Sequence, residues 1–390
     1  METTGPAAGD PTPLAGLRVL DLSRVLAGPL CTMVLADLGA DVVKVERPDE
    51  GDDTRHWGPP FAGDDAAYFL SLNRNKRSIA VDLATEEGSA LVRRLAARSD
   101  VLIENFRPGL MERFGLGLEA LRADHPGLIT CSLTAFGRGT PETATRPGYD
   151  IIVQALCGLM SMTGPRDGPP VKTGVAVLDV ITGLYAAIGI LSAVTERATT
   201  GTGRHVEVAL FDASVSAMVN QAANYLVGGI VPGPMGTEHP NIVPYQVFRA
   251  EDRPFVLAAG NDRLFARTCE VVGNPGWATD PRFVTNGDRV RHRDELIPLL
   301  EDVFGSRPAH AWIAALDAAG VPCSPILAMD EVFASAEGSA LVRTVDDPMR
   351  GPLRLVSSPI RIDGRTPSIR RPPPGLDQHG DAVRDELGGA

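Results

Sequence analysis

The sequence predicts an α/β protein with a large domain built on a doubly wound parallel sheet, followed by a smaller α+β domain. Short apolar runs alternate with helical patterns through the first part of the chain. A length of 390 residues is too great for one ordinary core. A Gly/Pro-rich stretch begins at Gly228. We therefore expect domains at 1–227 and 228–325, with 326–390 returning to the large domain.

The predicted sheet follows from five apolar runs that are separated by helical or loop segments. The runs lie at 17–22, 41–45, 79–83, 101–103 and 128–133, and helices are expected at 29–38, at 85–98 and through Leu121. Pro29 suits a first helical position, and Thr85 suits a helix N-cap. Because helices connect consecutive strands, parallel pairing is expected.

The remaining elements are predicted in the same way. A helix is expected from Asp150 to Met160, a strand at 205–210 and a helix at 213–226. In the smaller domain, strands at 245–248 and 254–258 flank a turn at Asp252, and a helix follows through Val272. The C-terminal tail contains a Pro-rich extended piece and one short helix.

Composition narrows the classes of function. A net charge of −12 argues against general binding to nucleic acid or to an anionic membrane. The five cysteines show no CxxC or other metal spacing, and the histidines form no ligand pair. These features predict a cytoplasmic protein with reduced thiols and no metal. The first 13 residues lack an apolar core, so we expect a flexible lead-in rather than a signal peptide.

A single carboxylate, Asp179, lies where an alternating apolar run, Val175 and Val177, which indicates a strand of the sheet, meets a long apolar helix. The helix is expected to bury positions spaced by three and four residues, and it ends at turn residues 199–201. The apolar positions are Ile181, Leu184, Tyr185, Ile188, Leu191 and Val194. Free N–H groups and the dipole at a helix start favour an ionised Asp179. It is therefore either an N-cap or a positioned nucleophile.

Two further segments indicate a ligand. Asn105, Phe106 and Arg107 directly follow a predicted strand, where parallel sheets bind ligands. Phe106 beside Arg107 suits stacking with a base ring. The segment Leu72–Ser78 carries three cations in four residues, which either grip phosphates or form a solvated charged turn. The loop SRVLAGP after the first strand lacks the G-x-G-x-x-G turn, so a dinucleotide site with Glu46 on a ribose is a weak alternative.

Several segments together resemble the class III coenzyme A transferases, the family of formyl-CoA and carnitine CoA transferases, which is related to the α-methylacyl-CoA racemases. The segments are LRVLDLSRVLAGPLCTMVLADLGADVVKVERP, LNRNKRSIAVDL, ENFRPGLMERFGLG, RPGYD, GVAVLDVITGLYAAIGIL and HPNIVPYQVF. They occur in order over nearly the whole chain. The resemblance implies a large Rossmann-like domain made from both chain ends, a small domain, and two ring-like chains that interlock as a homodimer.

The resemblance also implies roles for individual residues. Asp179 matches the catalytic aspartate, and the acyl-CoA is a co-substrate that needs no metal. The positions expected around coenzyme A are Leu26, Ala27, Arg47, Leu72, Asn73, Arg74, Asn75, Lys76, Asn105, Phe106, Arg107, Arg113, Tyr149 and Asp150. In the small domain, the turn residue His239 and the loop residues Gly260 and Asn261 are expected near the substrate, although a histidine beside Pro240 also suits a structural role.

The predicted activity is transfer of coenzyme A from an acyl-CoA to a small carboxylic acid through covalent intermediates on Asp179. One alternative is an α-methylacyl-CoA racemase, which moves the α-proton. Racemases of this superfamily have a histidine in a GHD motif, and this chain has Gly148-Tyr149-Asp150 there. A tyrosine, with an ordinary pKa near 10, is a poor partner for reversible deprotonation. A further alternative is a non-catalytic regulator that binds coenzyme A.

Overall fold

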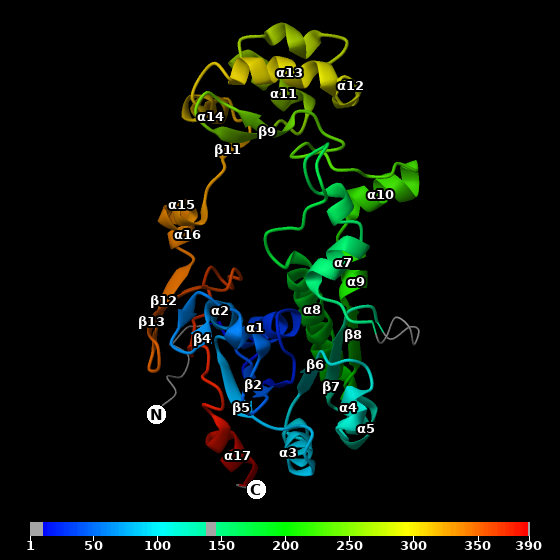
Figure 1. The fold of residues 1–390 in the computed structure, drawn as a ribbon, viewed down its shortest axis with the longest axis vertical. Coiled ribbons are helices and arrows are strands. Elements are labelled where there is room, and N and C mark those ends of the chain that lie inside the picture. Colours follow the sequence, from blue (N-terminus) through cyan, green and yellow to red (C-terminus); the bar gives the residue numbers. More distant parts are fainter. Residues whose placement is uncertain (1–10, 138–145, 389–390) are drawn as a thin grey trace. The chain divides into compact units, whose positions relative to one another are not determined.

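A computed structural model describes residues 11–137 and 146–388; most of the predicted lead-in lies outside these residues. The chain forms two compact units (Figure 1). The large unit comprises Met1–Gly158, Thr173–Leu226 and Gly338–Ala390, and the small unit comprises Leu159–Lys172 and Val227–Glu337. The domain limits expected from the sequence stay a prediction, and each unit is described by itself.

A six-stranded parallel sheet is the centre of the large unit, as the alternation of apolar runs predicts. Its strands are β1 (Arg18–Asp21), β2 (Asp41–Glu46), β5 (Lys76–Ala80), β6 (Val101–Glu104), β7 (Ile129–Thr134) and β8 (His205–Ala209). Their order is β5-β2-β1-β6-β7-β8, and every pairing is parallel. The order reverses between β1 and β6, and in such sheets ligands bind beyond the carboxyl ends of the strands at that point.

Both faces of the sheet are buried, because successive residues of a strand point to opposite sides. On β1, Leu20 packs into one apolar cluster with α3 (Glu86–Ala96) and α17 (Gly380–Gly388). Its neighbour Val19 packs into a second cluster with α1 (Ala27–Asp37) and α8 (Val177–Thr200). Thr85 caps α3 as predicted, since its hydroxyl accepts the Gly88 N–H at 3.0 Å.

Shorter elements complete the large unit. The helices are α2 (Ala67–Leu72), α4 (Leu110–Arg113), α5 (Leu118–Asp124), α7 (Asp150–Leu156), α9 (Leu210–Ser216) and α10 (Val219–Gly228, whose last two residues belong to the small unit). The 3-10 helix η1 (Asp53–His56) and the hairpins β3 (Phe61–Ala62)–β4 (Asp65–Ala66) and β12 (Val342–Asp347)–β13 (Gly351–Val356) also belong here. Residues 336–339 form the short helix α16 (Ala336–Ser339).

Three sequence predictions about local structure were wrong. Residues 171–176 are irregular rather than a strand, so Val177 begins a helix without a preceding sheet element. The helix expected at 150–160 ends at Leu156, and the one expected at 213–226 is divided into α9 and α10. Apolar content alone does not locate such breaks, because they depend on packing against other elements.

The two faces of α8 are also used differently from the prediction. The buried face is made mostly of small residues, which are Thr182, Gly183, Ala186, Ala187 and Ala193, together with Leu178 and Ile190. Gly183 approaches the backbone of α1 so closely that a Cβ there would lie 2.5 Å from the Ala27 carbonyl oxygen. The predicted core residues Leu184, Tyr185 and Ile188 are instead 44%, 41% and 60% exposed.

By length and apolar composition α8 is the one described helix that is suited to crossing a membrane. Core helices of globular proteins share these properties, and α8 packs against α1, α9 and β8.

The small unit is an α+β arrangement with its own core. Its antiparallel strands are β9 (Tyr245–Arg249), β10 (Pro254–Ala258) and β11 (Cys323–Pro325). The helices are α11 (Asp262–Val271), α12 (Asn286–Arg291), α13 (Arg293–Phe304), α14 (Ala309–Ala318) and α15 (Met329–Ala334), with 3-10 helices η2 (Met160–Met162) and η3 (Pro275–Thr279). The Phe304 ring packs against the rings of Phe248, Phe255 and Trp312 at centroid distances of 5.0, 5.1 and 5.2 Å, the last two edge to face.

Candidate active site

Asp179 lies in the first turn of α8, two residues after the helix begins. It is not the N-cap, because that position is Ala176 and no side chain of the described residues caps the helix from there. The carboxylate of Asp150, at the start of α7, does the capping instead. Its Oδ2 accepts the N–H groups of Leu178 at 3.0 Å and of Asp179 at 3.3 Å.

The free N–H groups that were expected to stabilise an ionised Asp179 are therefore occupied. Burial, followed by the nearby negative charge of Asp150, raises the pKa of Asp179 to about 7. This corrects the expectation of a fully ionised carboxylate. The physical reason is that the side chain is desolvated beside another carboxylate and forms no ion pair with the part of the chain that the structure describes, so its charged form is disfavoured. At neutral pH such a group is both partly ionised and more basic than an ordinary aspartate.

Asp150 is itself fixed by the segment that precedes α8. It is buried, and the side-chain amide of Gln154 donates to its Oδ1. Gln154 also contacts Thr173, accepting its backbone N–H at 3.0 Å and donating to its hydroxyl at 3.0 Å. These contacts tie the start of α7 to the irregular segment before Val177 and so orient the first turn of α8.

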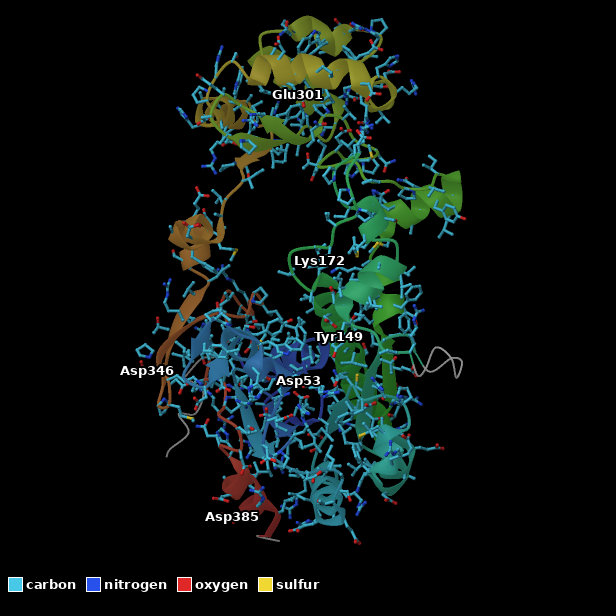
Figure 2. All side chains as sticks on the ribbon, viewed as in Figure 1. Asp53, Tyr149, Lys172, Glu301, Asp346 and Asp385 are labelled. Carbon is cyan, nitrogen blue, oxygen red and sulfur yellow. The ribbon has the colours of Figure 1, made fainter. Side chains whose placement is uncertain are left out.

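A cavity of about 200 Å³ opens beside Asp179 within the large unit. Among the predicted site residues, Leu26, Ala27, Asn105, Phe106, Arg107, Tyr149 and Asp179 line it. Tyr149, marked in Figure 2 together with Asp53, is 62% exposed at the start of α7, and Asp53 lines the same cavity. The start of α1 faces this cavity with Leu26 and Ala27, and no side chain of the described residues caps it.

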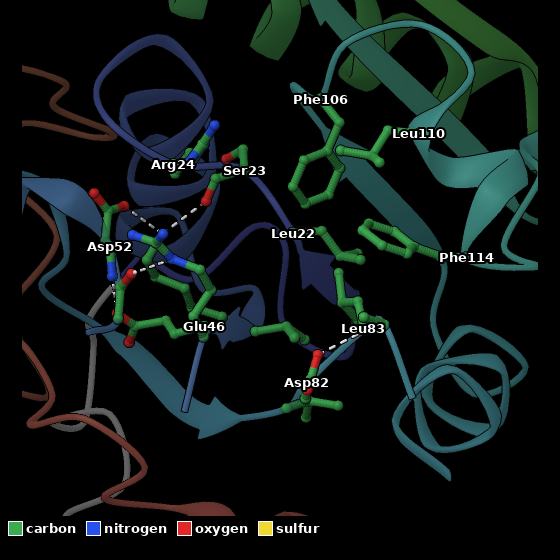
Figure 3. Close-up of a pocket in the computed structure, with 16 residues that line it drawn as sticks. Leu22, Ser23, Arg24, Glu46, Asp52, Asp82, Leu83, Phe106, Leu110 and Phe114 are labelled. Carbon is green, nitrogen blue, oxygen red and sulfur yellow. Dashed lines mark hydrogen bonds and ion pairs between the residues drawn. The ribbon is translucent and has the colours of Figure 1, made fainter. Parts of the chain in front are cut away.

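A second cavity, of about 240 Å³, lies at the carboxyl ends of β1, β2, β5 and β6. Figure 3 shows Leu22, Phe106, Leu110 and Phe114 gathered on one side of it, with Glu46 and Asp52 on the other. Arg47 lines this cavity and forms ion pairs with Glu50 and Asp53. Arg24 and Phe106 line both cavities, so the two adjoin.

The cation-rich segment 72–77 does not line either cavity, and its burial contradicts the interpretation as a solvated charged turn, whereas its contact with coenzyme A stays a prediction. Asn73, Asn75 and Lys76 are fully buried, and Leu72 and Arg74 nearly so. Arg74 pairs with Asp37 at 2.5 Å, Lys76 pairs with Asp21 at 3.2 Å, and Arg77 pairs with Asp41 at 2.6 Å. A run of cations can be solvated, bind a ligand or pair with buried carboxylates. Here the carboxylates lie 36–55 residues away in the sequence, so the run alone does not reveal them.

Arg113 and Asp150 line neither of these two cavities, and their contact with coenzyme A stays a prediction. Arg113 is exposed at the end of α4, one residue before the cavity residue Phe114. In place of segment 72–76, the residues that follow β5, Val81 to Ala84, line the apolar cavity. The rule that ligands bind beyond the carboxyl ends of parallel strands would have identified them.

Two basic residues of the Asp179 cavity, Arg24 and Arg146, were missed, and so was Tyr68, which lies near Asp179 but lines neither cavity. Arg24 and Arg146 were within quoted motifs but were not nominated. Tyr68, on α2, packs near Ala176 and Val180, and burial together with the charge of Asp179 raises its pKa. In the sequence, Tyr68 belongs to the apolar stretch AYFL, which indicates a core segment and does not indicate a residue near an active site.

The predicted substrate residues His239, Gly260 and Asn261 belong to the small unit. The Nδ1 of His239 accepts the Asn241 N–H at 3.0 Å, which is the structural role for a turn histidine. Asn261 is the N-cap of α11, where its side chain accepts the Leu264 N–H at 3.0 Å. Gly260 lies between β10 and this cap. Their contact with substrate stays a prediction.

Among the residues that the structure describes, no group of three or more His, Cys, Asp and Glu side chains is arranged to hold a metal ion.

The sequence and the fold of this chain were compared with those of known proteins. Residues 14–380 match the family model described as CoA-transferase family III. The succinyl-CoA:glutarate CoA-transferase of Mus musculus is 42% identical over 94% of this chain and 84% of its own length. The succinate–glutarate CoA-transferase of Agrobacterium fabrum is 42% identical over 96% of both chains. A CAIB/BAIF family protein from Brucella suis has a crystal structure with a TM-score of 0.84 and 46% identity, covering 96% of this chain and 99% of that one.

Proposed function

The chain belongs to CoA-transferase family III, and we propose that it exchanges coenzyme A between dicarboxylic acids through covalent intermediates on Asp179. The observation that carries the proposal is the position of Asp179. Its carboxylate has a pKa raised to about 7 and lines a cavity that adjoins a second, largely apolar one. A carboxylate that is desolvated but without a cation is suited to nucleophilic attack.

The apolar cavity suits the adenosine end of coenzyme A. Phe106 and Phe114 offer ring faces, and Arg47 and Arg24 supply cations at the edge for phosphate groups. The pantetheine arm then extends past Phe106 and Arg24, the two residues common to both cavities, and brings the thioester to Asp179.

The reaction proceeds in four displacements. The Asp179 carboxylate attacks the thioester carbonyl, which gives an aspartyl–acyl anhydride and releases the CoA thiolate. The thiolate attacks the aspartyl carbonyl, which gives an aspartyl–CoA thioester and frees the first acid. The acceptor carboxylate attacks this thioester to form a second anhydride and thiolate. The thiolate then attacks the acyl carbonyl of the acceptor, which releases the new acyl-CoA and restores Asp179.

Negative charge develops on oxygen in each displacement. The uncapped start of α1, where Leu26 and Ala27 line the cavity, is suited to stabilise it. The start of α8 is less suited, because Asp150 already accepts the N–H groups of Leu178 and Asp179.

Arg146 supports a dicarboxylic substrate. It lines the Asp179 cavity, and its guanidinium lies 4.9 Å from the centre of the Phe136 ring, an arrangement that orients a cation without neutralising it. The two transferases named above act on succinate and glutarate according to their names. A second carboxylate on the acid would pair with Arg146 while the first reacts at Asp179.

The exposed apolar residues Leu184, Tyr185 and Ile188 on α8 support a homodimer, which the family resemblance predicts to be interlocked. Sedimentation velocity tests this point. Ile188→Glu is expected to shift the protein toward monomer, whereas Thr199→Glu near the exposed end of α8 leaves the dimer intact. The five cysteines are free, which supports a reducing, cytoplasmic location.

The deciding experiment incubates the protein with acyl-CoA donors and a panel of mono- and dicarboxylic acids, with products identified by mass spectrometry. Transfer to dicarboxylic acids, together with a hydroxylamine-sensitive adduct on the peptide containing Asp179, is the expected result. Exchange of the α-proton for deuterium without any acceptor acid would instead identify a racemase. Coenzyme A binding with neither reaction would identify a regulator.

A further inference from the structure

The loop that joins β1 to α1 contains a strained residue. Val25 has a φ of 72°, in the left-handed region. A β-branched side chain rarely adopts this conformation, because its Cβ substituents crowd the backbone. The conformation therefore costs free energy, and it persists only where the surroundings hold it.

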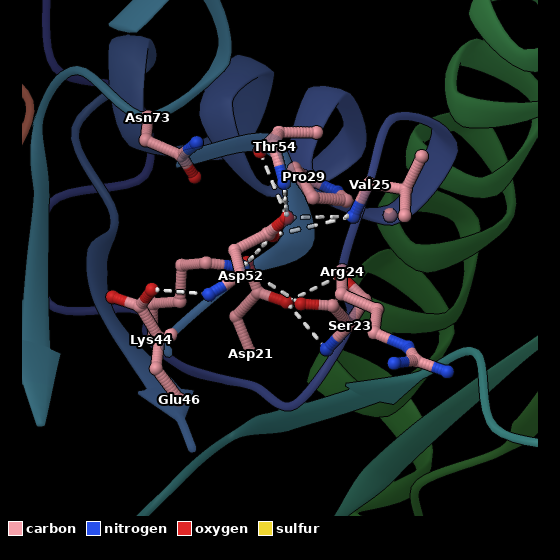
Figure 4. Close-up of polar contacts among 12 residues, drawn as sticks. Asp21, Ser23, Arg24, Val25, Pro29, Lys44, Glu46, Asp52, Thr54 and Asn73 are labelled. Carbon is pink, nitrogen blue, oxygen red and sulfur yellow. Dashed lines mark hydrogen bonds and ion pairs between the residues drawn. The ribbon is translucent and has the colours of Figure 1, made fainter. Parts of the chain in front are cut away.

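The carboxylate of Asp52 holds Val25 (Figure 4). Both of its oxygens lie 3.2 Å from the Val25 N–H. The Asp52 carboxylate also accepts the Thr54 N–H at 3.0 Å and the Thr54 hydroxyl at 2.8 Å. It pairs with the Nζ of Lys44 at 2.8 Å, and both side chains of this pair are 1% exposed. Lys44 and the hydrogen bonds from Thr54 outweigh the effect of burial, so the carboxylate is kept ionised and in one position.

The residues before Val25 are fixed by other side chains. Lys44 donates to the Ser23 carbonyl at 2.7 Å. The amide group of Asn105 accepts the Arg24 N–H at 3.0 Å and donates to the Arg24 carbonyl at 2.8 Å. Asp52 is thus the group that holds the strained residue itself.

The position of Val25 links the two cavities. Asp52 and Lys44 line the apolar cavity, whereas Val25, Leu26 and Ala27 line the cavity of Asp179. Helix α1 begins at Ala27, two residues after Val25. A change in the backbone at Val25 would therefore redirect the start of α1, whose residues Leu26 and Ala27 line the cavity of Asp179.

We propose that Asp52 is a positioning residue for the transfer reaction: it keeps Val25 in the left-handed conformation and so sets the start of α1 against Asp179. The inference rests on the proposed function. The competing explanation is that Asp52 and Lys44 form an ion pair that only stabilises the fold.

The test is a cycle of Asp52→Asn and Val25→Gly. Glycine adopts a positive φ without steric cost, so a chain with glycine at this position does not need the carboxylate. Asp52→Asn is expected to lower kcat by about 100-fold when valine is present, because a displaced helix start misaligns the site. With glycine at the same position, the loss is expected to shrink to about fivefold or less.

The matched control is Asp37→Asn, which removes a buried ion pair with Arg74 at the other end of α1. Its effect on kcat should be the same with valine or glycine at position 25. Circular dichroism monitors folding of every variant. If Asp52→Asn does not fold, Asp52→Glu keeps the charge beside Lys44 but moves the oxygens from the Val25 N–H, and the same rescue by glycine is expected.

Equal losses from the Asp52 variant in both backgrounds would overturn the proposal and leave a purely structural ion pair. Wild type and Asp179→Ala are assayed in parallel. If wild type transfers no coenzyme A, the proposed function fails. If wild type is active and the cycle is additive, only the role of Asp52 fails.

Discussion

Asp179 and Asp52 are two desolvated carboxylates of the large unit, and their pKa values are shifted in opposite directions from the ordinary value of 3.8. Burial alone raises the pKa of both. For Asp52 this effect is outweighed by Lys44 and by hydrogen bonds from Thr54, so its pKa falls to about 2. For Asp179 the neighbour is another carboxylate, Asp150, and the pKa rises to about 7.

The difference shows that the partner, rather than burial, decides what a desolvated carboxylate can do. A carboxylate that is paired with a cation and saturated with donors is fixed and weakly basic, which suits positioning of the backbone. A carboxylate that lacks a cation and lines a cavity is basic and accessible, which suits covalent catalysis. The following experiments are arranged from the largest expected effect to the smallest.

Removal of the Asp179 carboxylate should have the largest effect on kcat and should most clearly distinguish its role from that of Asp52. Asp179→Ala is expected to lower kcat by about 10⁴-fold or more, because the bond-forming group is lost. Steady-state kinetics and trapping with hydroxylamine measure the loss of turnover and of the covalent adduct. Binding of coenzyme A, measured by titration calorimetry, should be retained. Turnover by this variant at a rate near wild type would contradict the assignment.

The pH dependence of kcat/KM should follow Asp179 and not Asp52. The attacking form of Asp179 is the carboxylate, so the rate is expected to rise with pH and to level off above the pKa of about 7. The inflection is located by measuring kcat/KM between pH 5 and pH 9, at steps of about half a pH unit. The Asp52→Asn variant should be slower but keep that inflection. A rate that does not change with pH over this range would show that the pKa of Asp179 is not raised.

Asp150→Asn should sharpen the comparison by changing the charge next to Asp179 while keeping the cap of α8. An asparagine oxygen can still accept the N–H groups of Leu178 and Asp179. Because the negative neighbour is gone, the pKa of Asp179 should fall, and the inflection should move by about one unit toward acid. An unchanged inflection would assign the raised pKa to burial alone.

The smallest expected effect is on thermal stability, and it has opposite signs at the two sites. The pKa of Asp179 is above its ordinary value of 3.8, so its contribution to stability is present at low pH and is lost as pH rises through about 7. The pKa of Asp52 is below 3.8, so its contribution is present above that value and is lost as pH falls through about 2.

At pH 8, Asp179→Asn is therefore expected to raise Tm by about 2–5 °C, and Asp52→Asn to lower it by a similar amount. Near pH 4, which calorimetry can also reach, the difference between Asp179→Asn and wild type should largely vanish. A fall in Tm for Asp179→Asn at pH 8 would mean that the ionised carboxylate is stabilised by a partner.

Much of the architecture could be predicted because it depends on neighbours along the chain. Alternating strands and helices indicated the parallel sheet, and the placement of Asn105, Phe106 and Arg107 after β6 followed from the rule for carboxyl ends. The helix with Asp179 in its first turn was likewise visible in the spacing of apolar residues. The motifs of the family then indicated coenzyme A as the ligand.

What only the tertiary structure decided is which distant groups each charged residue meets. Asp150 caps a helix that begins 27 residues later, and Lys76 pairs with Asp21 in the interior, although its segment looks like a phosphate-binding turn. On α8, the large apolar residues Leu184, Tyr185 and Ile188 are exposed, whereas most of the buried positions are small. Periodicity reports local geometry, whereas burial and ion pairing depend on contacts between residues far apart in the sequence, and these contacts set the acidity of Asp179 and the strain at Val25.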